Sequence, residues 1–290
     1  SAELAAAWRL VVLVHGIAGR YQKADEAGAK SIAHARRAGS ERVVARNGLM
    51  MAMNALHGPL PVPEAIAQCE QLLAAGLGER QIECNVRCAL AQLRAMNGEL
   101  DAARTHYRQA RAMLRELGQG VYAASTAIDL ARVELQGGDL AQAQREAQAD
   151  ADFLAAKGET YFLSTLAALI AKLAREQGRD DEALALTHTA EAASGADDVE
   201  SQALWRMVRA PLLARQGDAA GAEAMAREAV ALARGTEASM LQAEALAELA
   251  AVLRAAGRDG WREAVDEALA LYAAKGHRAA AQRLADWAAR

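Results

Sequence analysis

The sequence is poor both in residues that build β-sheets and in residues that break helices. Aromatic residues make up only 4% of the 290 positions, and there are four prolines. Valine, isoleucine and threonine never form the alternating run that is typical of a half-buried strand. Much of the 53% hydrophobic content is instead alanine. Because alanine has the best helix propensity and lets helices approach closely, the composition predicts an all-α protein.

Three further shortages exclude whole classes of protein. The three cysteines are too few, and odd in number, for a disulfide framework. We find no signal-peptide pattern and no apolar run long enough to span a bilayer, so we expect a cytoplasmic protein with no membrane partner. The net charge of −4 does not suggest the basic face that phosphate contacts require, so we expect no nucleic-acid partner.

Glycine recurs at a fixed interval along the chain, and such a period is the signature of a helical repeat array. Seven glycines stand 39 or 40 residues apart: Gly19, Gly58, Gly98, Gly138, Gly178, Gly217 and Gly257. We expect each of them to end the first helix of a repeat in the left-handed conformation. A second series should end the second helix of each repeat: Gly39, Gly76, Gly118, Gly158, Gly195, Gly235 and Gly276.

Small and apolar residues stand at constant distances from each glycine of the first series. Alanine lies seven residues before it in five repeats and five residues after it in five repeats: Ala91, Ala131, Ala171, Ala210 and Ala250, then Ala24, Ala103, Ala143, Ala183 and Ala222. An apolar residue lies five before it in every repeat, from Val14 to Val252. We expect the alanines where the two helices cross. One such pair cannot bury its apolar face alone, so the pairs should stack.

The sequence therefore predicts one domain, a right-handed superhelix (α-solenoid) of about seven tetratricopeptide-like helix pairs of roughly 40 residues. The predicted repeats are 2–39, 40–78, 79–118, 119–158, 159–195, 196–235 and 236–276, and residues 277–290 form a capping helix. Pro211 lies inside a predicted helix, where it removes the hydrogen bond to the carbonyl of Met207. We expect a kink there, with a local widening of the groove.

No arrangement of residues points to catalysis, a cofactor or a metal. Cys84 and Cys88 lie four residues apart, with Cys69 and His57 on neighbouring helices, but the paired CxxC spacing of many zinc sites is absent. Free cysteine commonly serves as a small buried hydrophobe. We therefore expect a non-catalytic protein.

A polar row is the candidate binding surface. Gln92, Arg132 and Lys172 each stand six residues before a glycine, 40 residues apart, and Arg175 lies one turn from Lys172. Equivalent positions align along a stacked array, so we expect these four side chains to form a stripe on the concave face. The alternative is ordinary solvated charge.

The glycine and alanine pattern resembles the tetratricopeptide repeat, whose unit is about 34 residues long. A narrower resemblance covers nearly the whole chain, from about residue 8. It rests on "GPLPVPEAIAQCEQLLA", "RAMNGELDAAR", "GETYFLSTLAALIAKLAREQGRDDEALALT", "DDVESQALWRMVRAPLLARQG" and "EALALYAAKGHRAAAQRL". These segments are similar to the C-terminal helical region of bacterial nucleotide cyclase–ATPase regulators. In that family a cyclase domain and a signal-transduction ATPase precede a long repeat region.

The resemblance implies a regulatory arm that holds an ATPase off until a partner or ligand favours the other state. The family's catalytic motifs are absent here, so no catalytic residue carries over. The partner would be a protein, a peptide or another domain of the same polypeptide. Two alternatives stay open. One is a stand-alone adaptor that grips peptides in its concave groove. The other is a sensor of a small-molecule effector, with a pocket lined by Tyr122, Tyr161, Phe162 and Trp205.

Overall fold

The computed structural model describes residues 1–76 and 78–290, and this part of the chain is helical throughout, without strands. The helices are α1 (Ala2–Ile17), α2 (Tyr21–Arg37), α3 (Glu41–His57), α4 (Val62–Ala74), α5 (Arg80–Met96), α6 (Leu100–Glu116), α7 (Gly120–Ser125), α8 (Ala127–Glu134), α9 (Leu140–Ala156), α10 (Tyr161–Glu176), α11 (Asp180–Ala193), α12 (Val199–Arg215), α13 (Ala219–Arg234), α14 (Ser239–Ala255), α15 (Trp261–Lys275) and α16 (Arg278–Ala289).

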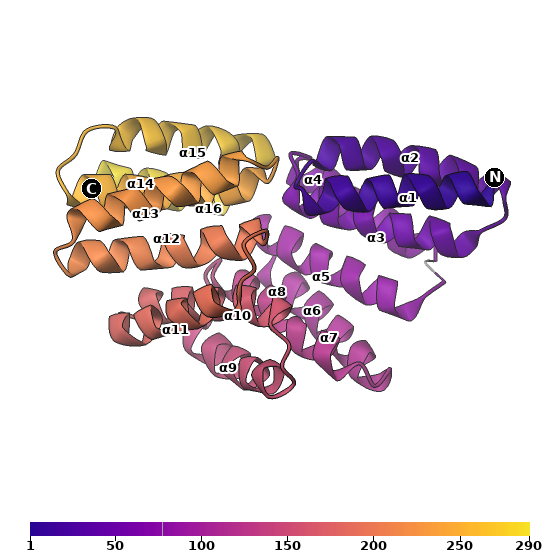
Figure 1. Ribbon diagram of the computed structural model, residues 1–290, viewed down its shortest axis with the longest axis horizontal. Helices are drawn as coiled ribbons and strands as arrows, with labels where there is room; N and C mark the ends of the chain where they lie inside the picture. Colours follow the sequence, from indigo (N-terminus) through magenta and orange to yellow (C-terminus); the bar gives the residue numbers. More distant parts are fainter. Residues whose placement is uncertain (77) are drawn as a thin grey trace.

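Consecutive helices form hairpins that stack side by side, as the repeat pattern predicts (Figure 1). Each of the seven predicted repeats holds one such hairpin, and α16 packs against α15 after the last. First helices also contact the first helices of neighbouring repeats, in the order α1, α3, α5, α8, α10, α12 and α14. These helices form a continuous inner layer, and the fold is the predicted solenoid of tetratricopeptide-like helix pairs.

The alanines of the repeat pattern lie in the core, as predicted. All ten alanines that flank the glycines are at most 1% exposed. The largest hydrophobic cluster extends from Ala91 to Leu284, whereas the cluster in the first hairpin has only Val12, Ala24 and Ala27 as fully buried members. The apolar core is therefore concentrated in the C-terminal two thirds of the chain.

The left-handed prediction is wrong at two of the seven glycines expected to end first helices. Gly19, Gly98, Gly178, Gly217 and Gly257 take positive φ, but Gly58 and Gly138 do not. Gly58 is extended, with φ −78° and ψ −174°. It precedes Pro59, and a residue before proline is pushed away from the helical region. In the fourth repeat Gly137, with φ 126°, takes the role predicted for Gly138.

The first helix of the fourth repeat is also interrupted, where the sequence pattern predicts one continuous helix. It divides into α7 and α8 at Thr126. The hydroxyl of Ser125 donates to the Tyr122 carbonyl at 2.8 Å, and that of Thr126 donates to the Ala123 carbonyl at 2.7 Å. Two consecutive hydroxyls thus compete for carbonyls that a regular helix would use, which is a known cause of helix bending.

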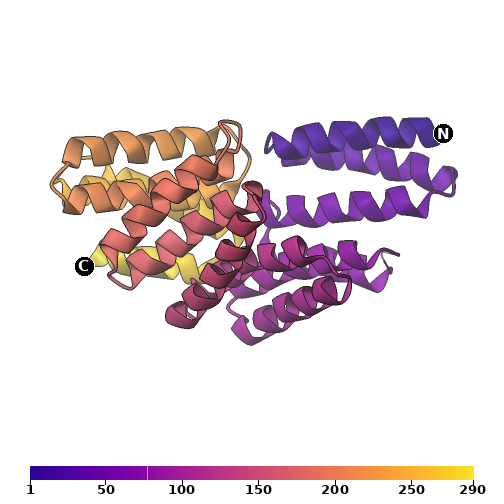
Figure 2. The same ribbon diagram turned by 60° about the horizontal axis from the view of Figure 1, so that its bottom comes forward.

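The two ends of the array meet in space. The backbone amide of Glu237 donates to the Gly19 carbonyl at 2.7 Å, and the Glu237 carboxylate accepts from the Gln22 amide at 2.8 Å. Figures 1 and 2 both show α1–α4 beside the C-terminal helices, with the middle repeats on the other side. We call this contact between α1–α4 and the segment from Thr236 to Lys275 the seam.

A buried lysine completes the seam. Lys275, at the end of α15, is 1% exposed. Its ammonium donates to the carbonyls of Ala55 and Gly58 at 2.8 and 2.7 Å, at the end of α3. Burial lowers the pKa of Lys275 to about 8. The seam is therefore held by hydrogen bonds between parts of the chain more than 200 residues apart.

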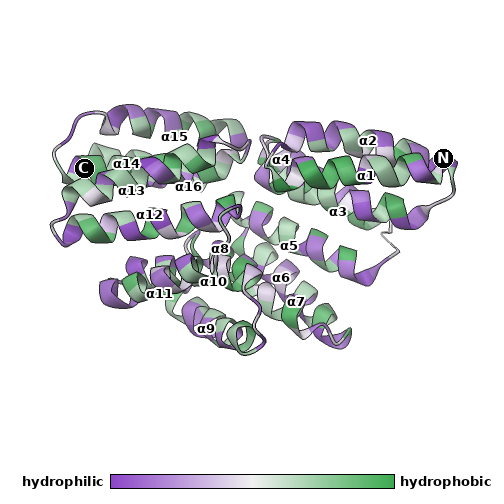
Figure 3. Cartoon of the chain, viewed as in Figure 1, coloured by the Kyte–Doolittle hydropathy of each residue, from purple (hydrophilic) through white to green (hydrophobic). Residues whose placement is uncertain are grey.

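The first helix, α1, carries apolar residues that are exposed to solvent. Leu10, Val14 and Ile17 of α1 are 63%, 64% and 80% exposed. In Figure 3, α1 accordingly shows a run of apolar residues. The residue that corresponds to Val14 in the fifth repeat, Leu173, is fully buried.

No helix in the described ranges is both long and apolar enough to cross a membrane.

Candidate binding site on the inner face

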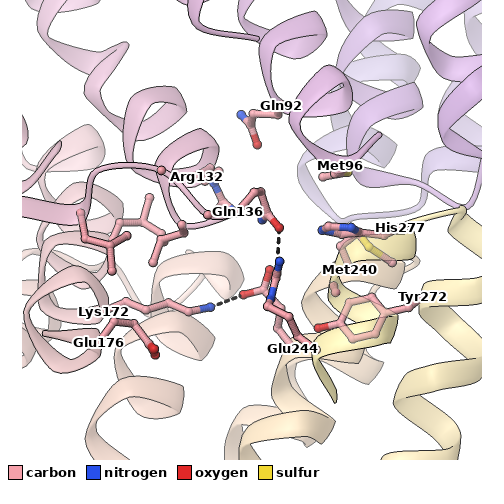
Figure 4. A pocket seen from close by; sticks show the side chains of 17 residues that line it. Gln92, Met96, Arg132, Gln136, Lys172, Glu176, Met240, Glu244, Tyr272 and His277 are labelled. Carbon is pink, nitrogen blue, oxygen red and sulfur yellow. Dashed lines mark hydrogen bonds and ion pairs between the residues drawn. The ribbon is translucent and has the colours of Figure 1, made fainter. Parts of the chain in front are cut away.

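The inner layer and the seam together surround a cavity of about 520 Å³. The first helix of every repeat contributes to its wall. A second pocket, of about 390 Å³, shares Gln92, Met96, Arg132, Met240 and Glu244 with it (Figure 4). We call the first the inner cavity and the second the adjoining pocket.

Three of the four predicted row residues come together here. Gln92, Arg132 and Lys172 all line the adjoining pocket, and Gln92 and Arg132 also line the inner cavity (Figure 4). They are largely shielded from solvent: Gln92 is 7% exposed, and the Arg132 and Lys172 side chains are 18% and 21% exposed. Both cations are also held in ion pairs. The side chains of the row are therefore less exposed to solvent than ordinary surface charges are.

Each cation of the row is paired with a carboxylate two repeats further along the chain. Arg132 Nη2 donates to Glu200 Oε1 at 2.5 Å, and Lys172 Nζ donates to Glu244 Oε2 at 2.8 Å. Burial on its own would raise the pKa of Glu244, but Lys172 and Arg132 hold it below its ordinary value. The ion pairs thus bridge the inner face and keep these groups charged inside it.

Arg175 does not line either space, so the structure places it differently from the predicted stripe. Its side chain is 7% exposed and donates to both carboxylate oxygens of Glu248, at 2.6 and 2.9 Å. It also donates to the Met207 carbonyl at 3.3 Å. That carbonyl lacks its helical partner because Pro211 has no amide hydrogen. The helix α12 continues through Pro211 to Arg215, and Arg175 satisfies the orphaned carbonyl.

The four aromatic residues of the small-molecule hypothesis do not gather into one pocket. Trp205 is 4% exposed, with the guanidinium groups of Arg206 and Arg209 at 4.0 and 4.4 Å from its ring centre. Phe162 contacts Tyr122 and Tyr161 edge-on. Of the four predicted aromatics, Tyr161 is the one that lines the inner cavity.

Several site residues have no signal in the repeat pattern. His277 points into the adjoining pocket beside Tyr272 (Figure 4), is 4% exposed, and its Nδ1 has no hydrogen-bond partner among the described residues. Burial lowers the pKa of His277 to about 4, so it is neutral near pH 7. Tyr21 and Asn54 line the inner cavity from the N-terminal side. The array must close before these residues face the row, and the repeat period alone does not specify that closure.

The cysteines do not assemble into a ligand set. Cys69 and Cys84 are buried in two separate hydrophobic clusters. Within the ranges that the structure describes, no group of three or more His, Cys, Asp or Glu side chains could hold a metal ion. What the inner face offers is an enclosed wall of methionines, tyrosines and paired charges, which is suited to holding a ligand.

No known protein family and no curated protein sequence matches this chain. Solved structures do share its fold. The Rap protein complexed with competence and sporulation factor superposes with a TM-score of 0.63 at 13% identity, covering 95% of this chain and 78% of that one. NprR in complex with its cognate peptide NprX gives 0.59 at 12% identity, covering 96% and 82%.

A third structure comes from a signalling ATPase. The signal-transduction ATPase with numerous domains (STAND) from Pyrococcus horikoshii, which has a tetratricopeptide repeat sensor, gives a TM-score of 0.53 at 13% identity. The match covers 98% of this chain and 49% of that one. At such identities the likeness shows the fold alone. The predicted tetratricopeptide-like fold is confirmed, and the narrower resemblance to cyclase–ATPase regulators stays a prediction.

Proposed function

We propose that this chain is a non-catalytic sensor module that binds a peptide, or an extended segment of a partner protein, on its inner face. The observation that carries the proposal is the inner cavity, to which all seven repeats contribute. Cavities of about 300–1,000 Å³ that enclose a few placed polar groups are typical of ligand sites. A ligand bound in this cavity would contact residues from every repeat.

The structural neighbours support this proposal by analogy of fold. Rap was solved with competence and sporulation factor, and NprR with its cognate peptide. The P. horikoshii protein is a signal-transduction ATPase with a tetratricopeptide repeat sensor. We therefore propose that this chain serves as the regulatory arm of a multidomain signalling protein, such as a nucleotide cyclase–ATPase. A stand-alone peptide adaptor is the alternative.

A display library of random heptapeptides tests the binding proposal. We expect selection on the whole chain to enrich peptides that bind it and raise its melting temperature, because a ligand of the folded state alone stabilises it. Binding should fall in an Arg132→Glu, Lys172→Glu variant, because the reversal breaks the ion pairs with Glu200 and Glu244 and sets like charges against each other across the inner face. It should persist in Arg80→Glu, Arg215→Glu, which reverses two cations that are also ion-paired but lie outside both cavities. A library that yields no binder would contradict the proposal.

The size of the native polypeptide separates the two contexts. An antibody raised against this chain would be used to probe a lysate of its source. A band several-fold larger than 30.6 kDa supports the regulatory arm, whereas a band near 30.6 kDa supports the stand-alone adaptor.

A further inference from the structure

The inner cavity has a composition that points to one kind of ligand. Four of the eight methionines in the chain line it: Met50, Met53, Met96 and Met240. They come from α3, α5 and α14, which are far apart in sequence, so no local helix pattern brings them together. Methionine is flexible and polarisable, and it is common on surfaces that bind apolar side chains of varied shape.

The same cavity is acidic. Four carboxylates line it, from Asp197, Asp198, Glu200 and Glu244. Arg132 pairs with Glu200 and Lys172 pairs with Glu244, so Asp197 and Asp198 are the two without a cationic partner among the described residues. Asp197 is exposed at the rim and has no ion pair within the described residues. These carboxylates also act on two tyrosines in the wall. Burial and the charge of Glu200 raise the pKa of Tyr21, and burial together with the charges of Asp198 and Glu200 raises the pKa of Tyr161. A cation would gain from this field, and an anion would be repelled.

A buried acceptor in the wall lacks a donor. Asn54 is 3% exposed, and its Nδ2 donates to Asp25 Oδ1 at 2.7 Å. That bond fixes the orientation of the amide, and its Oδ1 has no partner among the described residues. Unsatisfied buried acceptors are rare, because each forfeits a hydrogen bond to water. Protein atoms cover this oxygen, so a backbone N–H of an extended peptide would satisfy it once the wall around Asn54 shifts to admit the ligand.

From these three observations we infer that the inner cavity takes a peptide segment in which a basic residue stands beside a bulky apolar residue. The apolar side chain lies among the methionines, the cation faces Asp197 and Asp198, and a peptide N–H donates to Asn54. This inference rests on the proposed function and specifies the chemistry of its ligand.

The heptapeptides enriched by selection provide the first test. They should carry Lys or Arg next to Leu, Met, Ile or Phe. Synthetic versions of one selected peptide would then be compared: the original, a variant with Glu for the basic residue, and a variant with Ser for the apolar residue. Each replacement should weaken binding at least about tenfold, and binding of the original should weaken as salt rises.

A matched pair of protein variants locates the charge effect. Asp197→Lys should weaken binding at least about fivefold, whereas Asp259→Lys, an equal change at an exposed acid outside both cavities, should leave it unchanged. Asn54→Leu should weaken binding and leave its salt dependence intact, with circular dichroism confirming the fold. Selected peptides without the basic–apolar pair, or equal binding to both aspartate variants, would overturn the inference and leave the proposed function standing. If no peptide binds at all, both fail.

Discussion

Neighbouring repeats and the two sides of the seam are held together by different chemistry. Between neighbours, the contacts come from side chains such as Leu173 and Ala171, which are fully buried. Across the seam they come from backbone groups, the Glu237 carboxylate and the Lys275 ammonium. Burying apolar area is strong and non-directional, whereas a hydrogen bond adds little net stability but demands one geometry. The stack therefore supplies most of the stability, and the seam selects the curvature.

The largest expected effect contrasts a buried position with its exposed equivalent. Leu173→Ala should lower the free energy of unfolding by about 2–5 kcal/mol, because it leaves a cavity between packed helices. Val14→Ala, at the same place in the first repeat and 64% exposed, should change it by less than about 0.5 kcal/mol. Urea unfolding followed by circular dichroism measures both. Similar losses in the two variants would mean that the first helix is covered in solution.

Two glycines with the same backbone conformation allow the contribution of the seam to stability to be measured separately from backbone strain. Gly19 and Gly257 have φ of 65° and 63°, so an alanine at either position bears the same left-handed strain. At Gly257 an added Cβ meets nothing within 4 Å, whereas at Gly19 it would lie 2.6 Å from Thr236 Cβ. We expect Gly19→Ala to destabilise the protein by about 1–3 kcal/mol more than Gly257→Ala.

Hydrogen exchange followed by mass spectrometry shows where this loss occurs. In Gly19→Ala, peptides that contain the Gln22 and Glu237 amides should exchange faster, because both amides donate across the seam. In Gly257→Ala they should exchange as in the unchanged protein. Equal exchange in the two variants would show that the seam does not close in solution.

The smallest expected effect is a dependence on pH. The pKa of Lys275 is about 8 in the folded chain and about 10.5 when unfolded, so between these values the unfolded chain holds more protons. The lysine contribution to the free energy of unfolding therefore rises with pH across this window. The buried thiols of Cys69, Cys84 and Cys88, whose pKa values burial raises, act in the opposite direction.

The effect of Lys275 is therefore measured by comparing the unchanged protein with a variant that lacks the lysine. The unfolding free energy of the unchanged protein minus that of Lys275→Met should increase from pH 7 to pH 9.5, since the thiols are common to both. A neutral amine retains two N–H groups and can still donate both bonds, so the seam should persist at the higher pH. A flat difference would show that Lys275 is solvated rather than buried.

Much of the fold follows from the sequence because it is set within one repeat. Glycine spacing and the paired alanines predict the hairpins and their crossing points, and these contacts are local. The exceptions also have local causes, such as the hydroxyls of Ser125 and Thr126. The closure of the array is different in kind, because it depends on the summed rotation of all seven hairpins.

The candidate site is only partly predictable for the same reason. The common register of Gln92, Arg132 and Lys172 places them on one face. Their partners Glu200 and Glu244 occupy other positions in their own repeats, so the register does not identify them. Arg175 lies one turn from Lys172, but its side chain donates to Glu248 and to the carbonyl that Pro211 leaves free. A regular spacing predicts which side chains share a face of the array. It does not predict which of those side chains are free to contact a ligand.

The seam has a geometric consequence for the whole array. In an open solenoid each hinge between repeats is independent, and a twist at one hinge simply swings the free end. Once Gly19 and Glu237 are joined, the hinges form a closed linkage whose angles must sum to a fixed total. A twist imposed at one repeat must then be returned by the other six, or else the linkage separates at its weakest joint. A distortion made anywhere along the inner wall is thus either shared among all the other hinges or opens the ring at one contact.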